Sequence, residues 1–426
     1  MGGGLMQLVA YGAQDVYLTG NPQITFFKVV YRRHTNFSME CIQQTWSGSN
    51  IVDGRCVATI SRNGDLVHKM HLQLACDNGA ANPSISDLIV DAEVEIGGQS
   101  VDKQSGAFMQ AWNELTHTCG LDEAGNAAGT LFQKMSGTVD VGTNSRFVPL
   151  NFWFCKNAGL ALPLIALQYH EVKVSLNHTV TTALGAAVTS NNLWVDYIYL
   201  DTDERRRFAQ VSHEYLIEQV QEQTLQSGAT DHDLRFNHPV KELIWFATPT
   251  ANDAGLPRVT LPVVQHSDLA AATYTLKLNG HDRFSARPHT YFSRVQVYQH
   301  HSGDGGDNNY YKIAENVVEQ GLPGFNPGVP PGDVQNKLGY ISDSICVYSF
   351  ALNPEEHQPS GTCNFSRIDT AVLNTSAAVV DNAQNGLINH ENDNFDDDAP
   401  QVPRIVAINY NVLRIMSGMG GLAYSN

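Results

Sequence analysis

The sequence predicts an all-β protein built from two copies of one β-sandwich. Short runs of alternating apolar and polar residues recur along most of the chain, separated by turn-forming dipeptides. The 35 glycines and 17 prolines among 426 residues favour many turns and short strands over long helices. The order of strand-like features in the first half of the chain returns in the second half, which indicates an internal repeat.

Composition narrows the class of protein. Hydrophobic residues make up 42 % of the chain and charged residues 16 %, as in a globular protein rather than a disordered one. The 43 Asp and Glu outnumber the 26 Lys and Arg, so the formal charge is −17. A protein that coats DNA needs a positive surface for the phosphates, so we expect no direct nucleic-acid binding.

Cysteine usage and the apolar runs indicate the cellular compartment in which the protein is made. The seven cysteines are widely spaced and form no CxxC pair, which predicts reduced thiols made in a cytosol-like compartment. The N-terminus has no basic segment followed by an apolar one, so we expect no secretory signal. The most apolar run, residues 159–167, is far shorter than the roughly 20 residues of a membrane span, so we expect no membrane insertion.

In the first half, a Gly-rich arm precedes the strands. Residues 1–25 are expected to form an arm and 26–203 the first sandwich. Alternation is clear after Arg55, where Cys56, Ala58 and Ile60 should share the buried face. Asn63-Gly64 and Gly97-Gly98 are expected turns. The expected strands cover residues 24–33, 38–46, 55–62, 87–96, 99–103, 145–155, 170–178 and 191–201.

One helix and one charged connection interrupt this pattern. In residues 105–124, Phe108, Trp112 and Leu115 recur at helical spacing, which predicts a helix inserted in a loop. Residues 204–214 are expected to link the two sandwiches, with Arg205, Arg206 and Arg207 on a solvated face.

The second sandwich is expected over residues 215–426, where strand-like sequence resumes. Trp245 is predicted to lie in its core. Two blocks carry the repeat. Residues 95–103 resemble 277–285, and residues 148–176 resemble 345–373. The expected strands cover residues 216–226, 240–248, 272–280, 291–299, 344–352, 363–373 and 404–416.

Catalytic motifs are absent from the sequence. HExxH, GxSxG and the P-loop do not occur, so we expect no catalytic residue, cofactor or metal. Two clusters contain metal-ligand residue types, and in both we expect a surface loop instead of a metal site: His300, His301, Asp304 and Asp307, and Asp393, Asp396, Asp397 and Asp398. A jelly-roll lectin or carbohydrate-active enzyme stays open as an alternative. The sequons at Asn36, Asn177, Asn364 and Asn374 should carry no glycan without a secretory route.

Several long blocks resemble a known family. They include GGLMQLVAYGAQDVYLTGNPQITFFKVVYRRHTNF from Gly3, GLALPLIALQYHEVK from Gly159, WVDYIYLDTDERRRFA from Trp194, QPSGTCNFSRID from Gln358 and NYNVLRIMSGMGGLAYSN from Asn409. In order and over essentially the whole chain, they resemble the major capsid protein of nucleocytoplasmic large DNA viruses, in particular that of chlorella viruses and related algal viruses. Departures lie in the loops at 106–142, 248–272 and 300–339.

The resemblance implies a double jelly roll, with two eight-stranded antiparallel sandwiches side by side. It implies a homotrimer of pseudo-hexagonal outline that tiles an icosahedral shell beside neighbouring capsomers, in a virion made in the host cytoplasm. It places the arm on the inner face, against minor capsid proteins, and the second roll's loops and the helical insertion in outer towers. Asn252, in TANDAG, resembles a context for virus-encoded glycosylation. A minor paralogue of the coat protein is the alternative within this family.

Overall fold

The computed structural model describes residues 3–10, 13–19, 21–76, 85–118, 130–136, 145–184, 188–226, 228–249, 273–303, 345–376 and 401–424. Its contacts divide the chain into two units, residues 1–36 and 37–426, and each is described by itself.

The N-terminal unit contains two short helices, α1 (Gly3–Val9) and α2 (Val16–Thr19). The strand predicted over residues 24–33 is wrong, because this stretch has no strand pairing and its side chains are exposed. Phe26 and Phe27 are 88 % and 98 % exposed. An apolar alternating run becomes a strand only beside a partner strand, and the described residues of this unit provide none.

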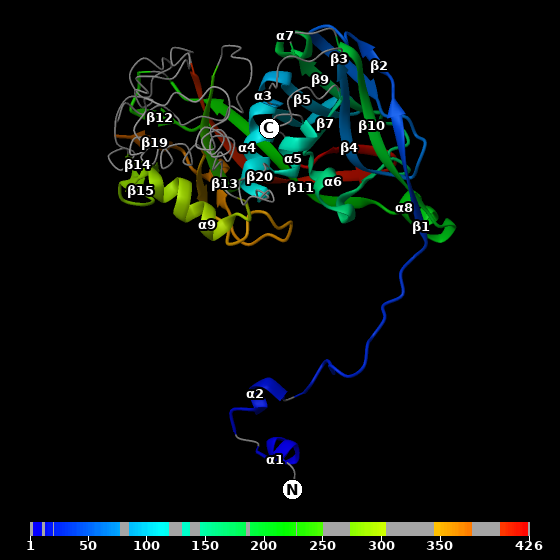
Figure 1. Cartoon of the computed structure of the whole chain (residues 1–426), viewed down its shortest axis with the longest axis vertical. Coiled ribbons are helices and arrows are strands. Elements are labelled where there is room, and N and C mark those ends of the chain that lie inside the picture. Colours follow the sequence, from blue (N-terminus) through cyan, green and yellow to red (C-terminus); the bar gives the residue numbers. More distant parts are fainter. Residues whose placement is uncertain are drawn as a thin grey trace, which may run out of the picture. The chain divides into compact units, whose positions relative to one another are not determined.

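The first roll packs two antiparallel sheets face to face (Figure 1). One sheet has the order β1-β10-β4-β7, with β8 beside β4, and the other has the order β2-β3-β9-β5-β6. Short helices lie in the connections. The elements are β1 (Phe37–Gln44), β2 (Trp46–Gly48), β3 (Gly54–Thr59), β4 (Leu66–Cys76), α3 (Ile85–Leu88), β5 (Ile89–Ile96), β6 (Gln99–Ser105), α4 (Gly106–Thr116), α5 (Leu131–Ser136), β7 (Ser145–Pro149), α6 (Trp153–Lys156), η1 (Ala158–Leu160), β8 (Leu162–Pro163), β9 (Val172–His178), α7 (Val180–Leu184) and β10 (Val188–Leu200).

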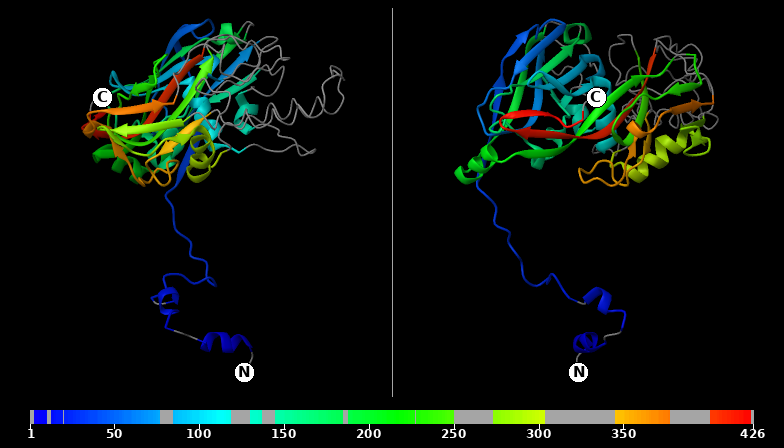
Figure 2. Two further views of the ribbon diagram at one scale, coloured as in Figure 1. Left: turned by 90° about the vertical axis from the view of Figure 1, so that its left-hand side faces the viewer. Right: turned by 180° about the vertical axis from the view of Figure 1, so that it is seen from behind.

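The second roll repeats this plan beside the first (Figure 2). Its sheets have the orders β11-β20-β13-β17, with β18 beside β13 and β21 beside β20, and β12-β19-β14-β15, with β16 beside β14. After α8 (Thr202–Gln210), the elements are β11 (His213–Thr224), β12 (Asp231–Asp233), β13 (Pro239–Pro249), β14 (Thr273–Leu278), β15 (His281–Asp282), β16 (Arg287–Pro288), η2 (Tyr291–Val295), α9 (Gln296–His300), β17 (Cys346–Ser349), β18 (Cys363–Asn364), η3 (Phe365–Arg367), β19 (Ala371–Thr375), β20 (Gln401–Met416) and β21 (Met419–Leu422).

The internal repeat is confirmed by strand order. The order β1-β10-β4-β7 matches β11-β20-β13-β17, the order β3-β9-β5-β6 matches β12-β19-β14-β15, and β8 joins β4 as β18 joins β13. The matched hairpins also share a turn: Gly97 and Gly98 have φ of 59° and 82°, and Asn279 and Gly280 have φ of 49° and 77°. Two consecutive positive φ values define the turn that suits a right-twisted hairpin, which is why Gly and Asn stand there.

The apolar faces of these strands form the cores. In the first roll, Cys56, Ala58 and Ile60 are buried as predicted. In the second roll, Trp245 is 1 % exposed and belongs to the core, also as predicted. The six cysteines in the described part of the chain are thiols without disulfide bonds, as predicted; Cys119 lies outside it.

Two local predictions were wrong, and the connection between the rolls has a structure that was not predicted. Residues 291–299 are helical, because Phe292 and Val297 pack from a helix against the second roll instead of alternating across a sheet. The strand over 145–155 ends at Pro149, and α6 follows. The connection after Leu200 is a helix, α8, whose first turn is capped by the Asp201 carboxylate, which accepts a hydrogen bond from the Thr202 N–H.

None of the helices in the described residues has the length and apolar character that a bilayer crossing requires.

Candidate assembly site at the junction of the two rolls

Helix α4 is the central element of the junction between the rolls. Its first turn is capped by Ser105, whose hydroxyl accepts a hydrogen bond from the Phe108 N–H at 3.1 Å. Gly106 lets the helix approach β5, because a Cβ at this position would lie 2.2 Å from the carbonyl oxygen of Ile89. The helix is therefore held tightly against the first roll.

The opposite side of α4 packs on the second roll. An apolar cluster joins α4 to the outer face of the sheet β11-β20-β13-β17, and all its members are buried: Ala107, Phe108, Ala111, Trp112, Leu115, Ile244, Phe246, Val297, Ile345, Val347, Val406 and Ile408. The helix was predicted and is confirmed, while the outer tower expected from the insertion that contains it stays a prediction. Its apolar stripe is buried between the rolls, where its apolar surface is removed from water.

A buried ionic cluster lies beside this apolar contact. The Lys241 ammonium, fully buried on β13, donates to Glu218 at 2.6 Å and to the carbonyl oxygen of Pro354 at 2.5 Å. Lys156 of the first roll donates to the same carboxylate at 3.3 Å and lies 4.2 Å from the centre of the Trp112 ring. Burial raises the pKa of Glu218, but the two lysines outweigh it and lower this pKa. The carboxylate thus stays charged and joins the two rolls.

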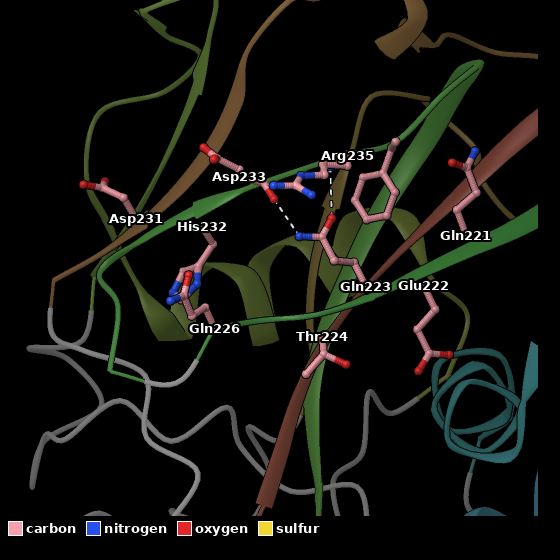
Figure 3. Close-up of a pocket in the computed structure, with 10 residues that line it drawn as sticks. Gln221, Glu222, Gln223, Thr224, Gln226, Asp231, His232, Asp233 and Arg235 are labelled. Carbon is pink, nitrogen blue, oxygen red and sulfur yellow. Dashed lines mark hydrogen bonds between the residues drawn. The ribbon is translucent and has the colours of Figure 1, made fainter. Parts of the chain in front are cut away.

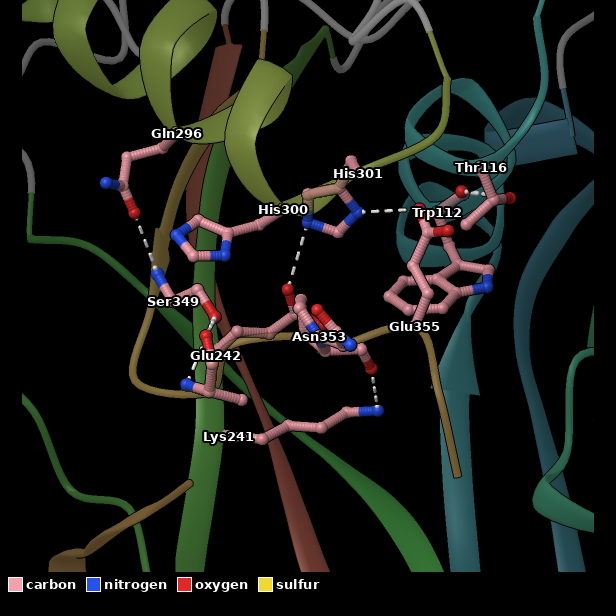
Figure 4. Close-up of polar contacts among 12 residues, drawn as sticks. Trp112, Thr116, Lys241, Glu242, Gln296, His300, His301, Ser349, Asn353 and Glu355 are labelled. Atoms are coloured by element: carbon pink, nitrogen blue, oxygen red, sulfur yellow. Dashed lines mark hydrogen bonds and ion pairs between the residues drawn. The ribbon is translucent and has the colours of Figure 1, made fainter. Parts of the chain in front are cut away.

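A second ionic cluster closes the junction below α9 (Figure 4). The fully buried His301 ring donates to Glu242 at 3.0 Å and to Glu355 at 3.1 Å. Burial opposes the protonation of His301, but the two carboxylates outweigh it and raise its pKa to about 9. The next residues reach the first roll, where Gly303 N–H donates to the carbonyl oxygen of Leu115 at 2.7 Å.

The surface-loop interpretation of the histidine cluster is therefore wrong for His301. His300 also has a structural role, since its Nδ1 donates to the carbonyl oxygen of Leu352 at 3.0 Å. Asp304 and Asp307 lie outside the described residues, and within the described residues no group of three His, Cys, Asp or Glu side chains is arranged to hold a metal ion.

The His301 cluster predicts a pH dependence of stability. Its pKa of about 9 in the folded chain exceeds the ordinary value of 6.5, so its contribution is complete below about pH 6.5 and is lost as pH rises through 9. We expect thermal unfolding midpoints to fall more steeply between pH 7 and pH 10 for the wild type than for His301→Gln. The loss of the charged His301 should lower the free energy of unfolding by up to about 3 kcal/mol. Parallel profiles would contradict a charged His301.

Strands and a hairpin also cross the junction. The Asp102 carboxylate on β6 accepts a hydrogen bond from the Val220 N–H of β11 at 3.1 Å, and burial raises the pKa of Asp102 to about 6. The β20–β21 hairpin reaches the first roll, where Tyr169 N–H donates to the carbonyl oxygen of Gly418 at 3.0 Å. Leu413 and Ile415 of β20 belong to the first roll's core. The two rolls are therefore joined through backbone, apolar and ionic contacts.

The connection between the rolls is also anchored. Arg205 on α8 pairs with Asp65 at 2.9 Å, and the Asp65 side chain is 4 % exposed. The expected solvated face is confirmed for Arg205, whose side chain is 61 % exposed while its guanidinium pairs with this buried carboxylate. Arg206 and Arg207 are exposed.

Of the remaining sequence candidates, only some lie within the described residues. Asn252 and the four aspartates of residues 393–398 lie outside the described residues. Asn177 and Asn374 are half-buried on β9 and β19, while Asn36 and Asn364 are exposed. The side-chain amide of Asn374 donates to Asp231 at 2.6 Å.

A polar pocket of about 660 Å³ lies in the second roll (Figure 3). His232, 2 % exposed, has no hydrogen-bond partner on either ring nitrogen among the described residues, and burial lowers its pKa. The carboxylate of Glu222 is paired with Arg404. Phe236 is the aromatic side chain of the lining on which a sugar would stack, but it is only 5 % exposed. The lining residues are Gln221, Glu222, Gln223, Thr224, Gln226, Asp231, His232, Asp233, Arg235 and Phe236.

Comparison with known proteins identifies the family. A family model described as "Major capsid protein N-terminus" matches residues 25–201, and one described as "Large eukaryotic DNA virus major capsid protein" matches residues 204–314 and 340–421. The major capsid protein of Pyramimonas orientalis virus is 48 % identical over 441 residues, which cover 100 % of both chains. The chain belongs to the major capsid protein family of large eukaryotic DNA viruses.

Other major capsid proteins agree. That of Paramecium bursaria Chlorella virus 1 is 40 % identical over 488 residues, covering 100 % of both chains. The solved capsid of the same virus matches with a TM-score of 0.69 and 34 % identity, over 94 % of this chain and 100 % of the solved one. The Faustovirus major capsid protein, 11 % identical over 95 % of this chain and 94 % of its own, has a TM-score of 0.57 and supports the fold alone.

The double jelly roll and the family that the sequence indicated are thus confirmed. This major capsid protein is a structural protein of the virion capsid of a large DNA virus. Sequence analysis missed its junction residues, among them Lys241 and His301. The available signal was weak: a Lys-Glu pair inside an otherwise apolar strand, and two histidines at the end of an aromatic run.

Proposed function

We propose that this major capsid protein forms a homotrimer of pseudo-hexagonal outline, which tiles an icosahedral shell beside neighbouring capsomers. The observation that carries the proposal is the pair of topologically equivalent rolls fixed to each other by a buried junction. Three such chains place six equivalent rolls around one axis, which gives the trimer a nearly hexagonal outline. Hexagons tile a plane without gaps. Each chain then needs one patch and its complement, as in any cyclic heterologous assembly.

The exposed arm supports a second contact in the shell. Residues 24–31 include Phe26, Phe27, Val30 and Tyr31, each at least 80 % exposed. Such a run of apolar side chains in water is costly, so it needs a partner. We assign minor capsid proteins on the inner face of the shell as this partner.

The proposed role is structural, without enzyme activity, cofactor or direct DNA contact. The net charge of −17 supports a shell that does not grip the genome. The protein would be made in the host cytoplasm, as its reduced cysteines suggest. The domain limits remain those predicted, with a link over residues 204–214, and Asn252 remains the proposed glycan site.

The test is the solution mass of the purified chain by light scattering, joined to intact-protein mass spectrometry. We expect a mass of three chains, and the same for a variant that lacks residues 1–21, because the arm is outside the trimer contact. An excess mass that disappears in Asn252→Gln would locate the glycan. A stable monomer that binds or hydrolyses glycans would instead favour the lectin or enzyme alternative.

A further inference from the structure

Two turns in the described part of the chain carry the same reactive pair of residues. Asparagine is followed by glycine at four positions of the sequence: Asn63, Asn78, Asn279 and Asn385. The structure describes the first and the third of these asparagines, and both are exposed to water. Any difference in reactivity between Asn63 and Asn279 therefore comes from how the fold holds each side chain.

An asparagine in such a pair can lose its side-chain amide without an enzyme. The backbone nitrogen of the next residue attacks the side-chain carbonyl carbon and forms a C–N bond, while the amide nitrogen takes up the backbone proton and leaves as ammonia. Water then opens the cyclic imide at either carbonyl, which gives aspartate or isoaspartate. A following glycine favours the attack, because it has no Cβ to crowd the nitrogen.

At Asn63 the reacting groups are free to meet. The side-chain amide donates one hydrogen bond, to the Ser61 hydroxyl at 2.9 Å, and the side-chain carbonyl oxygen accepts none from a described residue. The attacking nitrogen, that of Gly64, makes no hydrogen bond to a described residue either. One exposed contact is therefore all that opposes ring closure among the described residues.

The packing of the first roll requires the glycine of this pair. A Cβ at Gly64 would lie 2.8 Å from the Cβ of Tyr197 and 3.1 Å from Cδ1 of its ring. Tyr197 is 0 % exposed, and its hydroxyl donates to the carbonyl oxygen of Ser61 at 2.7 Å, so the ring is held in place. In a close-packed interior this ring leaves no room for a side chain at position 64. The reactive pair is thus a consequence of the fold.

At Asn279 the same groups are held apart. Its side-chain carbonyl oxygen accepts hydrogen bonds from the Asp369 N–H at 2.9 Å and the Thr370 N–H at 3.0 Å. Its backbone N–H donates to the carbonyl oxygen of Thr370 at 2.7 Å, and its φ of 49° is fixed by the tight hairpin turn. The side-chain carbonyl has to turn toward the nitrogen of Gly280 before a ring can close, and this movement breaks both of its hydrogen bonds.

A change at Asn63 acts on Asp65, which anchors the connection between the rolls. The Asp65 carboxylate accepts a hydrogen bond from the Leu200 N–H at 2.9 Å and pairs with Arg205 of α8 at 2.9 Å. The Asp65 N–H donates to the carbonyl oxygen of Ile198 at 3.1 Å. A new carboxylate two residues away repels the Asp65 charge, and isoaspartate also adds one carbon to the backbone of this turn.

We propose that Asn63 deamidates spontaneously in the folded chain, whereas Asn279 is protected. Water is the only co-reactant, and ammonia is released. The aspartate or isoaspartate at position 63 loosens the anchor of α8 at Asp65, so the connection between the rolls weakens as the protein ages. This modification site is separate from the proposed glycan site and does not depend on the proposed trimer.

Peptide mass mapping of the purified chain, incubated at mildly alkaline pH, measures both sites in one sample. In the folded chain we expect Asn63 to convert at least about tenfold faster than Asn279, because ring closure at Asn279 has to break two hydrogen bonds. In concentrated urea both turns are unfolded, and the two rates should come close together. Equal rates in the folded chain, or an Asn63 that converts only in urea, would overturn the proposal.

Asn63→Gln is the matched variant for the effect on the fold. Glutamine keeps the amide but closes its larger imide ring much more slowly. After the same incubation, the thermal unfolding midpoint of the wild type should fall by about 2–4 °C from that of the fresh protein, and that of Asn63→Gln should fall by less. The fresh variant should unfold like the fresh wild type, because its fold is intact. Equal falls in both aged chains would show that the anchor of α8 does not depend on residue 63.

Discussion

Replacing Lys241 with methionine is expected to lower the free energy of unfolding by about 3–5 kcal/mol, the usual cost of removing one partner of a buried ion pair. The ammonium is fully buried and donates to Glu218 at 2.6 Å. Without it, a carboxylate whose side chain is 8 % exposed keeps only Lys156, at 3.3 Å, among the described residues. The carbonyl oxygen of Pro354 also loses a donor.

The double variant Lys241→Met, Glu218→Gln is the control. It removes both charges, so no uncompensated charge stays buried, and it should be clearly more stable than Lys241→Met alone. Urea unfolding at pH 7, followed by circular dichroism, measures all three chains. If the single and double variants lose the same stability, the loss comes from packing at Lys241 rather than from its charge.

The sequence predicted most strands because, away from the junction, strands bury one face and leave the other more exposed. That arrangement makes apolar residues alternate with polar ones along the sequence, as at Cys56, Ala58 and Ile60. The repeat was also visible, because the Gly97 and Asn279 turns demand the same rare backbone conformation in both rolls.

The failures have a common physical cause. Residues 24–33 and 291–299 both have β-prone composition, yet one stretch has no partner strand within its unit and the other packs as a helix. Strand propensity measures fit to a neighbouring strand, and the sequence does not name the neighbour.

The junction was out of reach for the same reason. Lys241 and Glu242 read as polar residues of a half-exposed strand, and His301 reads as part of a Gly-rich loop. Their burial depends on residues far away in the chain, such as Glu218 and Glu355. The first roll completes their surroundings, because Lys156 pairs with Glu218 and the Trp112 ring lies against His301.

Trp245→Ala is expected to have a similarly large effect through a different mechanism. The indole is 1 % exposed, and its ring centre lies 5.1 Å from that of Phe292 and 5.4 Å from that of Tyr274. Truncation leaves a cavity in the core of the second roll and should cost about 3–5 kcal/mol. Trp245→Phe, which keeps an aromatic ring in the cluster, should cost less.

The position of Trp245 makes the outcome specific to the core. Its neighbour Ile244 faces α4 across the junction, whereas Trp245 faces the interior of the second roll. Urea unfolding should therefore show a lower midpoint for Trp245→Ala, and the yield of assembled protein at physiological temperature should fall with it. Wild-type stability and yield would show that the second roll does not depend on this aromatic cluster.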